Sequence, residues 1–368
     1  MDLNSIILYI FVSSIFSLVI SFPVINILYK FKIVRLIDKD FAAIIDSRRL
    51  KMGIPIMGGL IVVFTVLIIN LFFNLNGTTK IPLLVFTFSA ILGAFDDILN
   101  IYGKERKIRS VGRTICLIKV HANPFMRLFY LVTLPWAVFR WVFYLLGSNP
   151  GRGIQSHEKI IVQTIIGALV SWWIYFGSGW ENPGNIWFPW IGNIDIGVFM
   201  IPFIILTIIG TANAVNFTDG MDGLAAGLLL SAFFGFLVVA YTLGNASMTI
   251  LTATVIGSLI TYLYFNIPPA RFQMGDVGSL ALGTLLAVVA FALNRVVLLP
   301  ILGLFFVIET LSTIIQGVAR RLLGRRIFKM APIHHHFEML GWPEHKIVMR
   351  FWILSPILIL FGIWLSQF

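Results

Sequence analysis

Long apolar segments constrain this chain more than any other feature of its sequence. A helix that crosses a bilayer needs about 20 predominantly apolar residues. Ten candidate segments follow one another along the chain, at residues 3–28, 54–73, 81–99, 159–178, 196–213, 223–243, 246–265, 279–294, 296–319 and 347–367. With a mean hydropathy of +0.94 and 12% charged residues, we expect an all-α integral membrane protein, a single polytopic domain over residues 1–368 with ten transmembrane helices.

Three further features narrow the class of protein. Residues 3–28 follow Asp2 without a basic leader and are longer than a signal-peptide core, so we expect a first spanning helix there. Cys116 is the only cysteine, which excludes an internal disulfide and a thiolate metal cage. The net charge of +11 is attributed to membrane orientation and to contact with membrane lipids, and we expect no nucleic-acid partner.

The basic residues predict the orientation of the chain in the membrane. Alternating the ten segments places residues 29–53, 100–158, 214–222, 266–278 and 320–346 on one side. That side, with the adjoining helix ends, holds 25 of the 27 Lys and Arg residues, and only Lys80 and Arg295 fall opposite. Because basic loops remain in the cytoplasm, we expect a multi-pass membrane protein with this side facing the cytoplasm.

Residues 125–146 test this topology because they are also long enough to span. An eleventh span would reverse every later loop and turn the basic C-terminal loop outward. Pro135 interrupts the segment, and Arg127 and Arg140 flank its aromatic centre. We therefore expect an additional re-entrant or interfacial helical segment on the cytoplasmic side.

Polar residues gather at the predicted cytoplasmic ends of the spans. Charge near a bilayer is costly unless it has a use, so this clustering predicts a site. The members are Asp96 and Asp97 at the end of the third span, Asn213, Asn216, Asp219 and Asp222 at a spacing of three after the fifth, Asp276 at a helix start, and His334, His335 and His336 in a loop. A solvated helix end for Asp96-Asp97 and a helix cap for Asp276 are the structural alternatives.

The donor types indicate the chemistry of this site. Carboxylate and amide oxygens favour Mg²⁺, which proteins usually share with substrate phosphates. Three consecutive histidines cannot occupy one helical face, so zinc binding by all three is disfavoured, and phosphate contact or proton transfer suits them better. No phosphate-binding glycine loop, dinucleotide fingerprint or HExxH motif is present. The residues alone predict a Mg²⁺-dependent membrane enzyme that acts on phosphates, without identifying a substrate.

The same residues resemble a known family. Asp96-Asp97, NAVNFTDGMDGLAAG (213–227), MGDVGSLALG (274–283), RRIFKMAPIHHHFEMLGWPE (325–344) and MGIPIMGG (52–59) resemble the phospho-N-acetylmuramoyl-pentapeptide transferase family. This family belongs to the polyprenyl-phosphate N-acetylhexosamine-1-phosphate transferase superfamily. The motifs follow in matching order over nearly the whole chain, and APIHHHFE favours this branch over sister transferases that use N-acetylglucosamine phosphate.

The resemblance implies an activity and roles for individual residues. Members have ten spans, often form homodimers and work at the inner face of the bacterial plasma membrane. They require Mg²⁺ and transfer phospho-MurNAc-pentapeptide from UDP-MurNAc-pentapeptide to undecaprenyl phosphate, giving lipid I and UMP. By resemblance, Asp276 would bind the metal, and Asp96 would be the base for the lipid phosphate with Asp97 beside it. Asn216 and Asp219 would support the pocket, His334, His335 and His336 would contact phosphate or sugar, Gly220, Met221, Asp222 and Asn266 would line the uridine site, and Lys51 would lie near the nucleotide.

The chain also departs from the family pattern. Ile54 and Ile56 stand where threonines are usual, Asn100 replaces a lysine, Gln273 replaces a phenylalanine, and an insert occupies about 104–152. We expect the insert to lie against the cytoplasmic leaflet. The alternatives are a sister transferase that moves N-acetylglucosamine-1-phosphate or another sugar phosphate, and a transporter or flippase, although a transporter would favour charges at the midplane and paired repeats.

Overall fold

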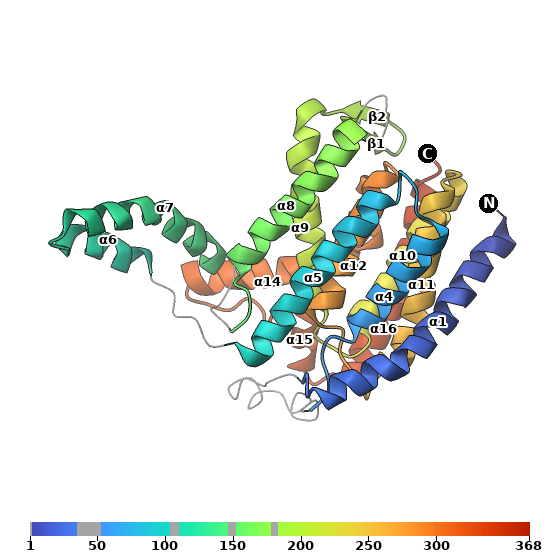
Figure 1. Cartoon of the computed structure of the whole chain (residues 1–368), viewed down its shortest axis with the longest axis horizontal. Helices are drawn as coiled ribbons and strands as arrows, with labels where there is room; N and C mark the ends of the chain where they lie inside the picture. Colours follow the sequence, from blue (N-terminus) through green and yellow to red (C-terminus); the bar gives the residue numbers. More distant parts are fainter. Residues whose placement is uncertain (1, 35–52, 104–109, 146–151, 178–182) are drawn as a thin grey trace.

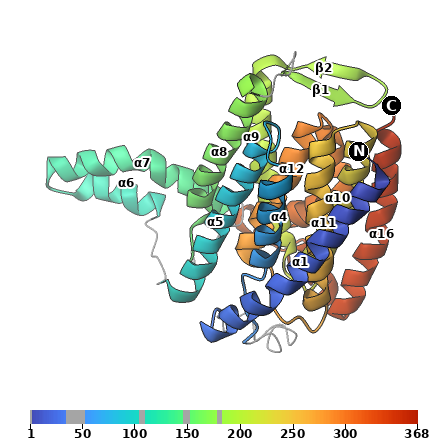
Figure 2. The same cartoon turned by 45° about the vertical axis from the view of Figure 1, so that its right-hand side comes forward.

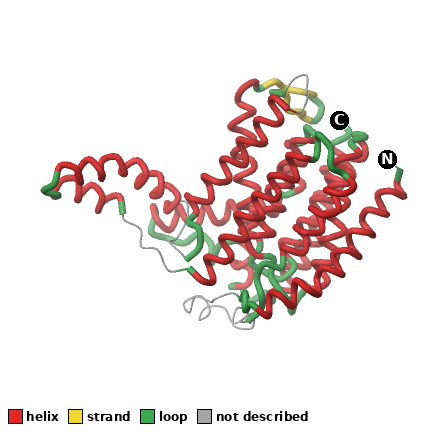
Figure 3. Tube along the Cα trace, in the orientation of Figure 1, coloured by secondary structure: helices red, strands yellow, loops and turns green. Residues whose placement is uncertain are grey.

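The computed structural model describes residues 2–34, 53–103, 110–145, 152–177 and 183–368. Its tube trace is dominated by helices (Figure 3), and both chain ends lie at the same end of the helical bundle (Figure 1). The main helices are α1 (Leu3–Lys30), α4 (Gly59–Phe73), α5 (Lys80–Tyr102), α6 (Val111–Val120), α7 (Pro124–Leu145), α8 (Ser156–Trp172), α9 (Met200–Thr218), α10 (Leu224–Thr242), α11 (Ala246–Asn266), α12 (Gly275–Ala292), α13 (Leu299–Leu302), α14 (Leu304–Leu322), α15 (Ile333–Glu338) and α16 (Glu344–Leu365).

The predicted class, an all-α multi-pass membrane protein, is confirmed. Within the described ranges, nine helices are long and apolar enough to cross a membrane, and a bent pair of helices would be a tenth if it formed one span. One of the nine is α7, which lies in the segment that the sequence assigns to the membrane surface. The second predicted span, 54–73, is represented by the shorter helix α4, which begins only at Gly59.

The ninth predicted span, 296–319, is not straight. Residues Val296–Leu302 and Leu304–Leu322 meet at an angle of 77° next to Gly303. The second arm, α14, carries the polar side chains Glu309, Gln316 and Arg320 among its apolar residues. An amphipathic helix of this kind is better accommodated across the bundle than through the bilayer core. Figure 1 shows α14 running roughly perpendicular to the spanning helices.

A small sheet lies at one end of the bundle. Strands β1 (Asn185–Phe188) and β2 (Gly192–Asp195) pair antiparallel in the loop before α9. This pair was not part of the all-α prediction. The Trp187 ring lies under the Arg295 guanidinium at 4.0 Å, which fixes the sheet to the turn after α12. Figure 2 shows the strands at the opposite end of the bundle from the lower end of α5.

Helix α12 forms the centre of the bundle. Every residue from Val277 to Phe291 is buried, and its main partners are α5 and α9. Membrane helices associate closely through small residues, and two glycine contacts show this here. A Cβ at Gly93 of α5 would lie 2.1 Å from the Asp276 carbonyl oxygen, and one at Gly283 of α12 would lie 2.7 Å from the Ala212 Cα. The polar ends of α5, α9 and α12 are thereby brought together.

Candidate active site

Asp97 joins the end of α5 to the start of α12. Its Oδ1 accepts a hydrogen bond from the Asp276 amide and its Oδ2 one from the Val277 amide, each at 3.1 Å. A carboxylate at the C-terminal end of its own helix opposes the macrodipole, whereas at the N-terminus of α12 it is favourable. Asp97, which is 4% exposed, therefore caps α12 and holds Asp276 at the opening of that helix.

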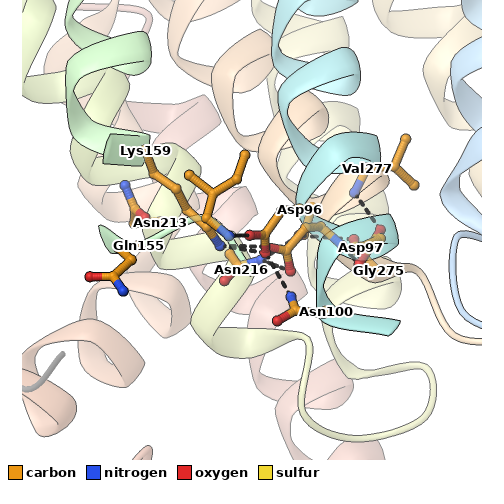
Figure 4. Close-up of polar contacts among 12 residues, drawn as sticks. Asp96, Asp97, Asn100, Gln155, Lys159, Asn213, Asn216, Gly275 and Val277 are labelled. Carbon is orange, nitrogen blue, oxygen red and sulfur yellow. Dashed lines mark hydrogen bonds and ion pairs between the residues drawn. The ribbon is translucent and has the colours of Figure 1, made fainter. Parts of the chain in front are cut away.

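A lysine links the two other carboxylates of this region. Lys159, near the start of α8, places its Nζ 2.8 Å from Asp96 Oδ2 (Figure 4). The same Nζ lies 2.6 Å from Asp276 Oδ2. The Asp96 side chain is 2% exposed, whereas that of Asp276 keeps 20% of its surface exposed. Two acidic groups from different helices therefore share one cation, and Asp276 is the carboxylate that remains open to a ligand.

Neutral donors fix Asp96 from its other sides. Asn100 Nδ2 donates to Oδ2 at 2.9 Å (Figure 4). The Ile154 amide donates to Oδ1 at 2.6 Å. Asn100 therefore contributes an amide dipole, and not a full charge, beside Asp96. A Cβ at Gly153 would lie 2.6 Å from Asp96 Oδ1, which explains a glycine beside the carboxylate.

The polar stripe predicted after the fifth span divides into two parts. Helix α9 ends at Thr218, so Asn213 and Asn216 are helical whereas Asp219 and Asp222 lie in the following turn. Asn216 Nδ2 donates to Asp276 Oδ1 at 2.8 Å, and Asp219 Oδ2 accepts from the Gly275 amide at 3.2 Å. Asn213 instead donates to Gln163 Oε1 at 2.8 Å and lies outside the cluster.

The residues expected to bind uridine are partly committed to joining two loops. Asn266 Oδ1 accepts from the Gly223 amide at 3.0 Å, and Asp222 Oδ2 accepts from the Ala270 amide at 3.2 Å. The Asp222 amide donates to Glu344 Oε1 at 2.6 Å, and Met221 is only 4% exposed. Phe272, beside Gln273, is fully buried and lies 5.3 Å from the Tyr262 ring centroid, so it is not presented for stacking.

The three histidines lie in the short helix α15 rather than in a loop. Their side chains have different partners. His334 Nδ1 lies 3.0 Å from Glu309 Oε2 inside the protein, while its Nε2 faces Gly220, where a Cβ would approach to 2.3 Å. His335 Nδ1 pairs with Glu338 Oε2 at 2.8 Å, and His336 Nδ1 accepts from the Lys329 amide at 3.1 Å. Of the three, His334 is the one next to the predicted substrate residues.

Sequence reasoning missed two charged residues of this region and could not place a third. Lys159 and Glu309 each contact a predicted site residue. Glu309 is a single charge inside an otherwise apolar segment, which is a usable signal because such charges are rare without a function. Lys159 gives no such signal, because it follows His157 and Glu158 at the start of its segment. Lys51, expected near the nucleotide, lies outside the described residues.

The donor set suits a hard cation such as Mg²⁺. Within the described ranges, no group of three His, Cys, Asp or Glu side chains is arranged to hold a metal ion. Asp96 Oδ2 and Asp276 Oδ2 nevertheless converge on one cation, the Lys159 ammonium. The two carboxylates face one positive charge, and the Asp276 side chain is partly exposed. This arrangement fits an ion that takes its remaining ligands from substrate phosphates and water.

An apolar cleft of about 480 Å³ lies beside the bend at Gly303. Helices α9, α12 and α14 and the turn before α13 form its walls, with Phe203, Leu286, Val297 and Phe306 among the lining residues. Such a cleft can hold an acyl or prenyl chain.

Comparisons with known proteins agree with the motifs. A family model described as Glycosyl transferase family 4 matches residues 151–294. A phospho-N-acetylmuramoyl-pentapeptide-transferase of Clostridium perfringens (strain 13 / Type A) is 35% identical over 312 residues, covering 83% of this chain and 82% of that protein. The corresponding protein of Chloroflexus aurantiacus is 34% identical over 334 residues, covering 87% and 79%. The one from Lacticaseibacillus paracasei is 41% identical over 241 residues, covering 66% and 74%. This chain belongs to the phospho-N-acetylmuramoyl-pentapeptide-transferase family.

Proposed function

We propose that this protein transfers phospho-MurNAc-pentapeptide from UDP-MurNAc-pentapeptide to undecaprenyl phosphate, giving lipid I and UMP. The observation that carries the proposal is the cluster of Asp96, Lys159 and Asp276, in which two carboxylates from different helices meet one cation. Phosphoryl transfer needs charge neutralisation and alignment rather than covalent help from the protein. Family membership supplies the identity of the two substrates.

The proposed reaction is a direct displacement at phosphorus. An oxygen of the lipid phosphate bonds to the β-phosphorus of the donor, the bond from that phosphorus to the bridging oxygen breaks, and UMP leaves with that oxygen and its electron pair. Asp96, held by the Ile154 amide and Asn100, would orient the lipid phosphate and take its proton. Mg²⁺, when bound at Asp276, would neutralise the diphosphate charge.

The surrounding residues are assigned supporting roles. Asn216 positions Asp276 by donating to the Asp276 carboxylate, and Asp97 does so by accepting from the Asp276 amide. Asp219 fixes the amide of Gly275. The uridine would bind near Gly220, Met221, Asp222 and Asn266, with Lys51 near the nucleotide. His334, His335 and His336 would contact the phosphate or sugar, with His334 closest to Gly220.

The membrane setting completes the proposal. The distribution of Lys and Arg supports an active site on the cytoplasmic side of the bacterial plasma membrane. The apolar cleft beside α14 would receive part of the prenyl chain of the acceptor, because its walls are almost wholly apolar. We also propose that the protein works as a homodimer, as its family often does.

UMP release by purified protein with undecaprenyl phosphate and Mg²⁺ tests the proposal. UDP-MurNAc-pentapeptide is compared with UDP-GlcNAc, and the wild type with Asp276→Ala. We expect release from the muramoyl donor alone and its loss in the variant. Turnover of UDP-GlcNAc would assign the protein to the sister transferases, and absence of release from either donor by correctly folded protein would contradict the proposal.

A further inference from the structure

Helix α7 is apolar over almost its whole surface, yet almost none of that surface is covered. Between Pro124 and Phe143, only Tyr130 and Ala137 are buried. Nine large apolar side chains of this helix are exposed by 40–80%: Phe125, Leu128, Phe129, Leu131, Val132, Trp136, Val138, Trp141 and Val142. A soluble surface does not carry an apolar patch of this extent, so this surface is covered by lipid or by another protein.

The direction of the hairpin formed by α6 and α7 indicates how it meets the membrane. By length and composition α7 could cross a bilayer. In Figures 1 and 2, however, the hairpin extends sideways from the bundle, roughly perpendicular to the spanning helices, in both views. Since the spanning helices define the membrane normal, α6 and α7 lie along the membrane plane.

The root of the hairpin is fixed to the bundle. The Trp136 ring meets the His157 ring edge to face with centroids 5.1 Å apart, and it stacks on Phe139 at 5.5 Å. Helix α7 also contacts α8 and α14. The hairpin therefore joins the bundle next to the start of α8, close to Lys159.

The positive charge of the α6–α7 hairpin favours an anionic lipid surface as its partner. From Arg106 to His157 the chain has eight Arg and Lys residues and no Asp or Glu. In the described hairpin, Arg113, Lys119 and Arg127 are exposed. Exposed cations next to an apolar helix suit an anionic leaflet, in which acyl chains cover the apolar side chains and headgroup phosphates meet the basic ones.

We propose that the α6–α7 hairpin is an in-plane arm that lies in one leaflet and binds anionic phospholipid headgroups through Arg113, Lys119 and Arg127. The assignment to the cytoplasmic leaflet rests on the orientation in the proposed function, whereas the in-plane placement and the lipid contact do not. Such an arm would keep the site beside α8 in a leaflet region enriched in anionic lipids.

The native chain offers a direct test because Cys116, its only cysteine, is exposed on α6. Full-length protein carrying a fluorescent maleimide at Cys116 is reconstituted in vesicles that contain phosphatidylcholine and phosphatidylglycerol. Nitroxide-labelled forms of either lipid, and aqueous iodide, then serve as quenchers. We expect strong quenching by the lipid nitroxides, several-fold more from labelled phosphatidylglycerol than from labelled phosphatidylcholine, and little from iodide.

Charge variants separate headgroup binding from simple insertion. Combining Arg113→Gln, Lys119→Gln and Arg127→Gln should abolish the preference for phosphatidylglycerol while lipid quenching persists. The matched control combines Arg325→Gln, Arg326→Gln and Lys346→Gln, which removes the same charge from other exposed positions and should keep the preference.

Several outcomes would overturn the arm. Full quenching by iodide would place the label in water. Energy transfer between labels without lipid quenching would mean that a second copy covers the hairpin. A preference for phosphatidylglycerol that survives in the triple variant would exclude headgroup binding by the three basic residues. Reaction of Cys116 with an impermeant maleimide outside intact cells would contradict the cytoplasmic leaflet. None of these readouts requires UMP release, so failure of the proposed transferase activity would be recognised separately.

Discussion

The Lys159 ammonium holds together two carboxylates that would otherwise repel each other. Replacing it by methionine keeps the unbranched side chain up to the ε position and removes the charge between Asp96 and Asp276. We expect Lys159→Met to lower the rate of UMP release by about 10²- to 10³-fold, the range measured for loss of one electrostatic contact at a reacting centre.

The arginine variant tests the geometry of the same contact. Lys159→Arg should recover only part of the rate, because a planar guanidinium cannot replace a compact ammonium between two carboxylates. Lys80→Met, at the start of α5 and far along that helix from Asp96, serves as the control and should leave the rate unchanged. Near wild-type turnover by Lys159→Met would show that the ammonium contributes nothing to catalysis.

Glu309 and Gly220 act on His334 from opposite sides of its ring. Glu309 Oε2 holds Nδ1, and the absence of a side chain at Gly220 leaves room for Nε2. We expect Glu309→Gln and Gly220→Ala each to lower kcat by about ten-fold or more, because a displaced imidazole loses the alignment that positioned groups contribute.

Steady-state kinetics with both substrates, alongside thermal melting, check this prediction. Gly77→Ala is the control for Gly220→Ala, since a Cβ at Gly77 meets nothing within 4 Å. Loss of thermal stability with unchanged kcat in folded protein would assign Glu309 a purely structural role.

At the scale of elements, the contact between α5 and α12 sets the geometry of the site. A Cβ at Gly93 would lie 2.1 Å from the Asp276 carbonyl, which belongs to the backbone and cannot move independently. We expect Gly93→Ala to force the two helices apart, to cost about 1–3 kcal/mol as overpacking usually does, and to reduce activity as well.

The melting temperature in detergent and the rate of UMP release provide the measurements. Gly112→Ala in α6 is a matched change of a helical glycine, and a Cβ there meets nothing within 4 Å. A Gly93→Ala variant with a wild-type melting temperature and rate would show that the α5–α12 spacing is not critical.

The sequence predicts elements better than it predicts their directions. Hydropathy identified segments that became α1, α10, α11 and α16 because burial in lipid depends on composition along the chain. It could not reveal the 77° bend at Gly303, since a bent and a straight helix have the same composition. The contacts of Lys159 and Glu309 depend on the packing of α8 and α14 against other helices, and spacing within one segment does not record that.

The local motifs likewise predicted which residues belong to the site, but not how each one is used. Asp96, Asp97, Asn216, Asp219 and Asp276 were each expected at a site, and the fold brings them into one network. The distinction between them was not visible in the sequence. Asp97 and Asp276 are both acidic residues at helix ends, but the backbone amides of α12 occupy the Asp97 carboxylate. The Asp276 carboxylate instead contacts Lys159 and Asn216 and keeps 20% of its side chain exposed.

For the molecule as a whole, the basic residues are distributed unevenly between the two ends of the helical bundle, and the proposed site lies at one of these ends. The ends of α5 and α9 that carry Asp96 and Asn216 lie at the pole of the bundle opposite the two-stranded sheet (Figures 1 and 2). The sheet end carries Lys80 and Arg295, the two basic residues that the predicted topology leaves outside. A translocation machinery that retains basic loops would therefore orient the proposed site toward the cytoplasm, where nucleotide-linked sugars are available as substrates.

Thiol accessibility in intact cells tests this orientation. In a Cys116→Ser background, Lys80→Cys should react with an impermeant maleimide added outside, because it begins α5 at the sheet end. Lys329→Cys, an exposed position before α15, should react only after the membrane is permeabilised. Both variants must react fully in detergent, which confirms that each thiol is accessible in the folded protein. The reverse pattern would invert the molecule and place Asp276 outside the cell, away from any nucleotide-activated donor, so that the proposed transferase reaction would fail together with the orientation.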